Sequence, residues 1–284
     1  MAHYTTKETR AEATSPDWLR TGAQLGQLVN EWALRSDLVA YVGPGAGGPA
    51  PACYNPILAE IEVNVSTAFG MGITPDDIGD LTIRSVQYDW PKASGAIFHE
   101  ALHARFSRWN IESAITELTD KEFAAINLLE ESRIEYHGVA TTPDNRAFLR
   151  ACALEIVLAD AEESIASLTS TRAAATLAGL TLARVDAGVL DYADVEPISE
   201  VLDKILGEDV VRKLSTIWTR FQMHDKHHDY LPLVPLAQEW VAVVEGLATE
   251  RGEEETETLS KEMQQLLQEM LDALAESADI TAIG

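Results

Sequence analysis

Apolar residues recur at intervals of three and four along most of the chain, which is the spacing of amphipathic helices. The first such segment begins at Ser15 and Pro16, a pair typical of a helix start, and continues to about residue 37. The face that this helix buries is expected to carry Leu25, Leu28, Val29 and Trp32. The pattern therefore predicts a mostly helical protein.

A shorter part of the chain alternates apolar and polar positions instead. Within residues 58–66, Ile61, Val63 and Val65 alternate with polar side chains, which is the period of a half-exposed strand. A second strand is predicted through 81–90, and the turn-rich residues between the two would allow a β-meander. We expect a small sheet at about 58–90, immediately before the next helix.

A further short strand is possible at residues 38–42, followed by the glycine- and proline-rich loop 43–52. Beyond residue 94 nearly every segment has helical periodicity, and Thr119 with Glu122 forms a capping box. The predicted helices span residues 94–110, 120–137, 142 to about 190, 197–222 and 236–248. The fold class predicted is mainly α with a small β-sheet.

The composition changes sharply near residue 250. Four glutamates follow one another closely between Glu253 and Glu257, and an amphipathic helical pattern comes after them. We interpret residues 1–248 as one domain and 249–284 as an acidic linker with a helix that could dock onto another domain or a protein partner.

Charge and length narrow the classes of function. The chain has 284 residues, enough for a large core, and a formal charge of −25 from 46 acidic and 21 basic residues. That charge would repel nucleic acid and anionic membrane surfaces. The N-terminal residues are polar, and no run approaches the ~18 apolar residues of a spanning helix. We expect a cytoplasmic protein that binds neither nucleic acid nor membrane.

The sequence HEALH, with His99, Glu100 and His103, lies inside the predicted helix 94–110. Two histidines four residues apart on a helix can direct their imidazoles at one Zn²⁺ ion. The glutamate between them is then placed to act as general base on a zinc-activated water. This HExxH motif is the strongest chemical signal in the chain.

A catalytic zinc site needs a third protein ligand. HEALHARFSRW lacks the glycine and third histidine of the metzincin motif, so the ligand must come from further along. The next helix offers Glu130, Glu131 and Glu135 in the run NLLEESRIEYH. Glu131 and Glu135 share a face, so one could bind the metal while the other holds a ligating histidine. Arg133 could orient a carboxylate or hold the helix against the sheet.

Together the two motifs resemble the gluzincin arrangement, in which HExxH is followed by a helix with a carboxylate ligand. The run NLLEESRIE is also similar to a segment of bacterial and phage metallopeptidase-like proteins related to the cobaltochelatase subunit that carries a von Willebrand A domain. The likeness covers about residues 94–140. It implies a zincin-like core with additional C-terminal helices, Glu131 as third zinc ligand and Glu135 as its supporting acid, with Glu130 as the alternative ligand.

The run HDKHHDY could supply a donor to a developing oxyanion if the C-terminal helices fold back over the site. An exposed polar loop between helices would explain the same residues. The candidate donors are His224, His227, His228 and Tyr230.

The leading hypothesis is a zinc metallopeptidase, an endopeptidase rather than an exopeptidase, whose peptide or protein substrate lies along the edge of the sheet. The alternative is a non-catalytic scaffold of the same fold that binds a protein partner such as an ATPase or a von Willebrand A module.

Overall fold

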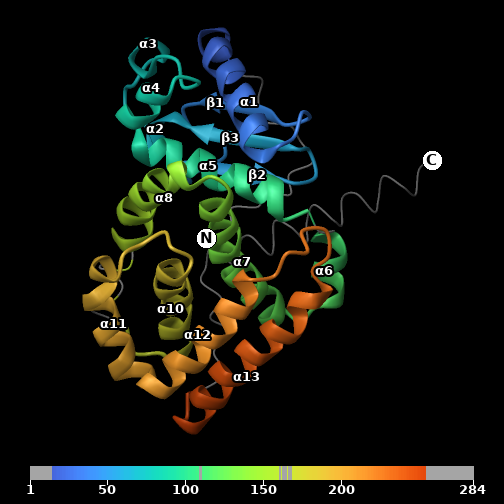
Figure 1. The fold of residues 1–284 in the computed structure, drawn as a ribbon, viewed down its shortest axis with the longest axis vertical. Coiled ribbons are helices and arrows are strands. Elements are labelled where there is room, and N and C mark those ends of the chain that lie inside the picture. The colour runs from blue at the N-terminus through green and yellow to red at the C-terminus, as the bar shows by residue number, and fades with distance from the viewer. Residues whose placement is uncertain (1–14, 109–110, 160, 162–164, 166–167, 254–284) are drawn as a thin grey trace, which may run out of the picture.

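A computed structural model describes residues 15–253 except 109–110, 160, 162–164 and 166–167. Helices dominate, and three short strands form a small mixed sheet (Figure 1). The predicted coarse class, mainly α with a small β-sheet, is confirmed. Of the linker and helix predicted for residues 249–284, residues 254–284 lie outside the described residues, and α13 continues to Glu250.

The elements of the first half are α1 (Leu19–Ala33), β1 (Val39–Gly43), β2 (Ala52–Asn55), β3 (Glu60–Asn64), α2 (Val65–Ala68), α3 (Pro75–Ile78), α4 (Arg84–Asp89), α5 (Pro91–Phe106) and α6 (Ile111–Glu117). Those of the second half are α7 (Asp120–Thr141), α8 (Arg146–Cys152), α10 (Thr171–Asp186), α11 (Tyr192–Leu206), α12 (Glu208–Gln222) and α13 (Val234–Glu250), with a π-helical segment at Ala153–Leu158 and short 3-10 turns at Pro16–Trp18, Pro143–Asn145 and Leu231–Leu233.

The sheet has the strand order β1-β3-β2, with β1 parallel and β2 antiparallel to β3. The strands expected at 38–42 and within 58–66 are confirmed, whereas β2 was not predicted and begins at the last residue of the expected loop 43–52. Helix α1 packs against β1, and α5 packs against β2 and β3. The sheet therefore lies directly beside the helix that carries the HEALH motif.

The strand predicted at 81–90 is wrong, because this segment forms a turn followed by α4. Asp80 accepts hydrogen bonds from the backbone and hydroxyl of Thr82, and Gln87 donates to the carbonyl of Leu81. These local hydrogen bonds satisfy polar groups of the segment, so it needs no neighbouring strand. The sheet consequently occupies residues 39–64 instead of 58–90.

β3 is not half-exposed as its alternation suggested, since all five of its residues are buried. The glycine-rich loop covers its polar face. Glu62 accepts a hydrogen bond from the backbone of Gly47, and Asn64 bonds to the backbones of Gly45 and Gly48. Gly47 has a φ of +70°, and a Cβ there would lie 2.7 Å from Sγ of Cys53. Polar side chains on a strand can thus be buried where a loop supplies their partners.

Two helix boundaries also differ from expectation. Helix α1 ends at Ala33, because Leu34 takes a left-handed conformation with φ 51°. The single helix predicted at 197–222 is two helices, separated at Gly207, whose φ of 88° ends α11 before α12 begins. Glycine reaches such φ values at little cost.

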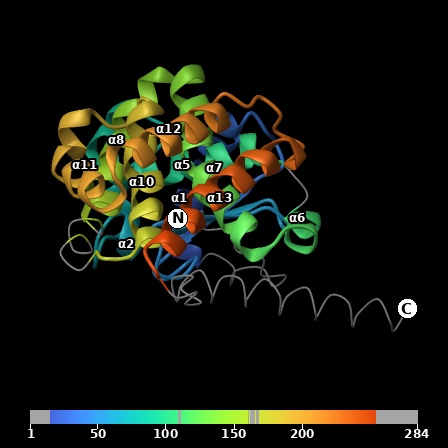
Figure 2. The same cartoon turned by 90° about the horizontal axis from the view of Figure 1, so that it is seen from below.

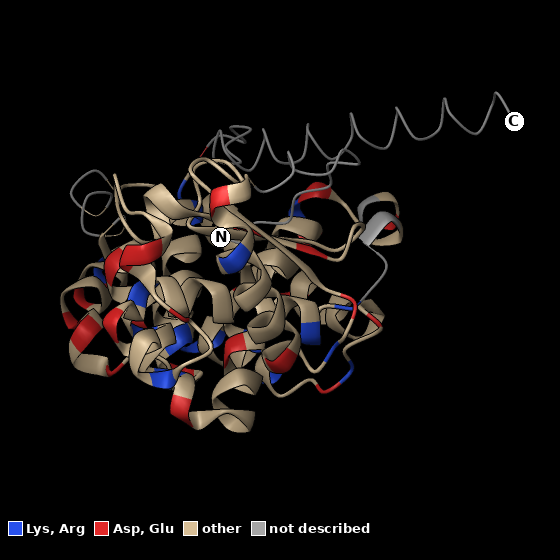
Figure 3. Cartoon of the chain, turned by 90° about the horizontal axis from the view of Figure 1, so that it is seen from above, with Lys and Arg blue, Asp and Glu red and all other residues tan. Residues whose placement is uncertain are grey.

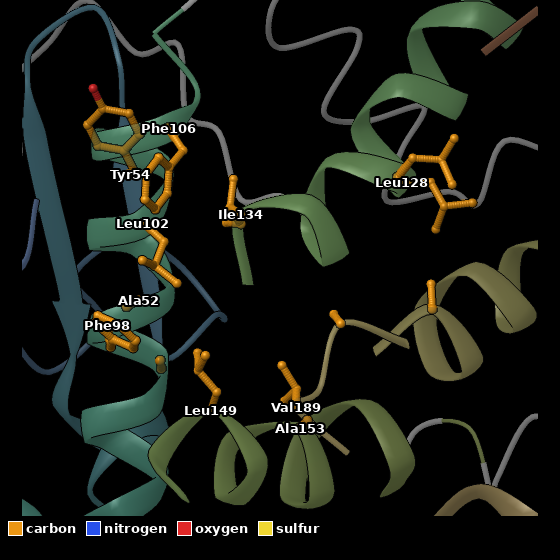
Figure 4. Packing of buried hydrophobic residues seen from close by; sticks show 14 of the residues in the cluster. Ala52, Tyr54, Phe98, Leu102, Phe106, Leu128, Ile134, Leu149, Ala153 and Val189 are labelled. Atoms are coloured by element: carbon orange, nitrogen blue, oxygen red, sulfur yellow. The ribbon is translucent and has the colours of Figure 1, made fainter. Parts of the chain in front are cut away.

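Helix α7 runs through the centre of the helical part (Figure 2), where it packs against α5, α10, α12 and α13. The capping box predicted for its start is present, with Thr119 and Glu122 bonding to each other's backbones. Figure 4 shows Phe98 and Leu102 of α5 between the strands and Leu149 of α8. Together α5 and α7 form the interior on which the smaller elements pack.

Residues Leu231–Glu250 are long and apolar enough to cross a membrane by composition alone. In the structure this segment packs on α7, α10 and α12. Its charged residues pair with neighbouring helices, as in Arg220–Glu239 at 2.7 Å and Arg172–Glu245 at 2.8 Å. These contacts are those of a helix within a helical bundle.

Basic positions are scattered among acidic ones over the visible face (Figure 3), without a single basic region there. Several pairs of opposite charge join different helices, such as Arg150 of α8 with Asp194 of α11 at 2.5 Å. The acidic excess of the chain is therefore offset locally where helices meet.

Helices α5 and α8 cross closely at Gly95. A Cβ on Gly95 would lie 2.1 Å from the carbonyl oxygen of Phe148, which is backbone and cannot move aside. We expect Gly95→Ala to lower the free energy of unfolding by about 3 kcal/mol or more, because the two helices must separate. Urea denaturation would measure this change.

Gly26 in the middle of α1 is a matched control, because a Cβ there meets nothing within 4 Å. Gly26→Ala should leave stability unchanged or raise it by about 0.5–1 kcal/mol through helix propensity. Equal effects of the two substitutions would contradict the close crossing at Gly95.

Candidate metal centre

The two histidines of the HEALH motif lie on one face of α5, one turn apart. Their imidazole rings are 4.8 Å apart with their planes at 82° to each other. The side chain of His103 is 1% exposed and that of His99 is 12% exposed. Both rings therefore direct nitrogen atoms into the interior between α5 and α7.

Glu131 of α7 lies between these two rings. Its Oε2 is 3.3 Å from Nε2 of His99 and its Oε1 is 3.4 Å from Nε2 of His103. Two ligand atoms of a tetrahedral zinc site, with bonds of about 2.1 Å, are about 3.4 Å apart. Among the described residues, these three side chains form a group that could hold a metal ion, with ligand atoms within 4.8 Å of one another.

Glu135 lies one turn further along α7 and contacts the other nitrogen of His99. Its Oε1 is 3.0 Å from Nδ1. Because an ionised carboxylate only accepts hydrogen bonds, Nδ1 carries the proton in the neutral ring, which leaves the lone pair of Nε2 towards Glu131. The structure thus places Glu135 where the sequence predicted a supporting acid.

His103 is held in the same tautomer by Ser107, which the sequence reasoning missed. Oγ of Ser107 lies 3.2 Å from Nδ1 of His103 and donates to Glu130 at 2.6 Å. Its single proton goes to Glu130, so the hydroxyl accepts from Nδ1. The sequence signal for this contact was the spacing, since Ser107 follows His103 by four residues.

Glu130, the alternative third ligand, points away from this group. Arg133 donates to both of its oxygens at 2.6 Å, through Nε and Nη2. The carboxylate whose oxygens lie among the histidine nitrogens is that of Glu131 instead. Arg133 also donates to the carbonyl of Phe106 at the end of α5, so it both orients a carboxylate and ties α7 to α5.

Arg184 of α10 is a second buried residue that the sequence reasoning missed. Its Nε is 2.9 Å from Oε2 of Glu135 and its Nη2 is 3.3 Å from Oε2 of Glu131. In the sequence it looks like an ordinary arginine near the last turn of a helix. Only the packing of α10 on α7 brings it to the carboxylates.

The charges in this group stabilise one another. Burial would lower the pKa of His99, but the carboxylates of Glu131 and Glu135 raise it to about 10. Burial opposes ionisation of Glu131, yet neighbouring charges including His99 hold its pKa well below its usual range. Burial lowers the pKa of His103. Without a metal, His99 carries a proton that a bound cation would have to displace.

Glu100 is buried at 3% exposure against the edge strand β2. Burial raises the pKa of its carboxyl to about 8, partly offset by His99 and by a backbone hydrogen bond from Tyr54. Among the described residues, its Oε2 has no hydrogen-bond partner. A carboxyl with a pKa near neutrality can both accept and return a proton.

The HDKHHDY run is not brought to the ligand atoms. His227 accepts from Nη1 of Arg133 at 3.1 Å, and the carbonyl of His224 accepts from the same atom at 3.0 Å. His228 is exposed, and Tyr230 donates to Glu117 at 2.7 Å. The run is instead a loop that Arg133 holds against α5 and α7, so its expected role as oxyanion donor has no support in this geometry.

A cavity of about 470 Å³ opens at the end of α5. Tyr54 of β2 and Ser107 form part of its wall, with Arg35 and Arg108 beside them. Ser107 contacts His103, so the cavity begins one side chain away from the histidine pair. It lies next to the edge strand β2.

No model of a known protein family matches this chain, and neither curated proteins nor solved structures show a match to it.

The contact between Arg133 and His227 predicts a pH dependence of stability. Burial and the charge of Arg133 lower the pKa of His227 to about 4, from 6.5 in an unfolded chain. Between pH 6.5 and 4 the unfolded chain therefore binds a proton that the folded protein does not, so stability falls as pH decreases. His227→Asn, which keeps an acceptor for Arg133, should lose less melting temperature than the wild type between pH 7 and pH 5.

His228→Asn is the matched control, because this neighbouring side chain is exposed. It should show the wild-type fall in melting temperature. If His227→Asn also shows that fall, protonation of His227 does not weaken the folded state.

Proposed function

We propose that this chain is a zinc-dependent peptidase. The observation that carries the proposal is the position of Glu131 between Nε2 of His99 and Nε2 of His103, at 3.3 and 3.4 Å. Two imidazoles and one carboxylate are the ligand set of many catalytic zinc sites. The histidines come from α5 and the carboxylate from the later helix α7, which supports the resemblance to gluzincins.

The contacts around the ligand residues also fit a bound metal. Glu135 and Ser107 hold the outer nitrogens of the two histidines, which fixes both rings with Nε2 inward. Supporting contacts of this kind raise metal affinity roughly 10- to 100-fold in other sites. When bound, zinc would supply Lewis acidity to a water nucleophile and to the substrate carbonyl.

Glu100 is the proposed general base. It follows His99 directly, and its buried carboxyl has a pKa raised to about 8. It would take the proton of the attacking water and later return it to the leaving amine. Its backbone contact with Tyr54 keeps it beside β2.

A peptide substrate would extend the sheet at β2, which is an edge strand in the order β1-β3-β2. Pairing with a sheet edge suits extended peptides, so an endopeptidase is proposed. A substrate in this position would pass Glu100 and could place a side chain in the cavity beside Tyr54 and Ser107. We also propose a cytoplasmic location, in keeping with the sequence.

Burial of the ligands favours a second candidate, a scaffold that keeps its metal for structure. His103 and Glu131 are each 1% exposed, and structural zinc sites are closed whereas catalytic sites keep an open position. Such a protein would act by binding a partner such as an ATPase or a von Willebrand A module, for instance through its acidic C-terminal segment.

Metal content tests the site itself. The purified wild type should contain about one zinc per chain, and so should Glu100→Gln, because Glu100 is not one of the grouped ligand residues. His103→Ala should lose the metal, since one of three ligands is gone. Elemental analysis after gel filtration would decide, and a wild type free of zinc even after zinc is supplied would refute the site.

Cleavage separates the two functions. Wild type loaded with zinc should cleave unfolded proteins or members of a peptide library, and Glu100→Gln should cleave them at least ~100-fold more slowly. Mass spectrometry of the products would locate the cut bonds. Zinc bound without any Glu100-dependent cleavage would favour the scaffold.

A further inference from the structure

Arg184 is buried at 2% exposure where α10 meets α7. Its guanidinium reaches two carboxylates, Glu135 at 2.9 Å and Glu131 at 3.3 Å. Nη1 donates to the carbonyl of Leu180, one turn earlier on its own helix, at 2.7 Å. Three contacts in different directions leave the side chain little freedom.

The same two carboxylates also contact the histidines. Oε1 of Glu135 contacts Nδ1 of His99, while Oε2 contacts Arg184. Oε1 of Glu131 lies towards His103, while Oε2 lies between His99 and Arg184. Arg184 therefore occupies the side of the carboxylates away from α5.

Buried carboxylates are costly unless a positive charge is close. Arginine keeps its charge at every physiological pH, whereas a metal ion can leave. Arg133 is committed to Glu130 and to the carbonyl of Phe106. Among the described residues, Arg184 is thus a permanent positive charge in contact with both Glu131 and Glu135.

We propose that Arg184 is a positioning residue that keeps Glu131 and Glu135 in place when no metal is bound. By pairing with Oε2 of Glu135 and with Oε2 of Glu131 it fixes both carboxylates beside the histidines, so the ligands are arranged before the metal arrives. This inference rests on the metal site of the proposed function. Zinc and Arg184 would then both balance the two buried negative charges. The fold would therefore need zinc less for its stability while Arg184 is present.

The test compares melting temperatures of the full chain with one equivalent of zinc and with EDTA. Arg184→Met leaves both carboxylates without their arginine, so the zinc-free form should melt lower by roughly 10 °C. The zinc-loaded form should lose much less, because the ion still balances the charge. The stabilisation by zinc should therefore exceed the wild-type value by about 5 °C or more.

Arg172→Met is the matched control, because Arg172 lies on the same helix and pairs with Glu245 away from the site. It should lower both melting temperatures equally and leave the zinc-induced shift unchanged. Arg184→Lys, which keeps the charge, should give a shift between those of wild type and Arg184→Met.

An equal fall of both melting temperatures in Arg184→Met would overturn the inference, since Arg184 would then only support the fold. If Arg184→Met is unfolded even with zinc, Arg184→Lys decides, and a zinc-induced shift equal to that of wild type overturns the inference. A wild type that zinc does not stabilise would refute the metal site and this inference together. Zinc stabilisation without peptide cleavage would refute the peptidase alone.

Discussion

The structure depends on the burial of three carboxylates on one helix. Glu130, Glu131 and Glu135 of α7 are at most 3% exposed, and each would destabilise the fold without compensation. Different partners provide it: Arg133 and Ser107 for Glu130, the two histidines for Glu131, and His99 with Arg184 for Glu135. The positions of the neighbouring elements follow from these pairings.

Each pairing joins α7 to another part of the chain. The contacts of Glu131 fix α5, those of Arg184 fix α10, and Arg133 holds the end of α5 and the loop around His224. Small residues permit the close approach, since a Cβ on Gly138 would lie 2.5 Å from Leu102. A site made in this way is precise because its ligands are held by the same contacts that hold the helices together.

This arrangement links metal binding with folding. A side chain that orients a ligand here is also a partner for a buried charge, so its loss affects stability as well as metal affinity. Glu100 differs from the others, because it lies against the edge strand and its acid form is favoured by burial. The proposed catalytic role and the structural role therefore belong to different glutamates, Glu100 on α5 and the three carboxylates on α7.

The sequence by itself determined most helices and the central residues of the candidate site. Periodicity identifies α1, α5 and α7, and the four-residue spacings of His99 with His103 and of Glu131 with Glu135 put each pair on one helix face, because a helix repeats every 3.6 residues. The tertiary structure alone decided which carboxylate meets the histidines. Glu130 and Glu131 are adjacent in sequence but point about 100° apart on α7, and only the packing of α5 selects between them. It also decided that a glycine loop buries β3 and that Arg184 lies beside Glu131 and Glu135, because these contacts connect residues far apart in the sequence. The turn at Asp80 depends instead on local hydrogen bonds that the alternating pattern of 81–90 did not reveal.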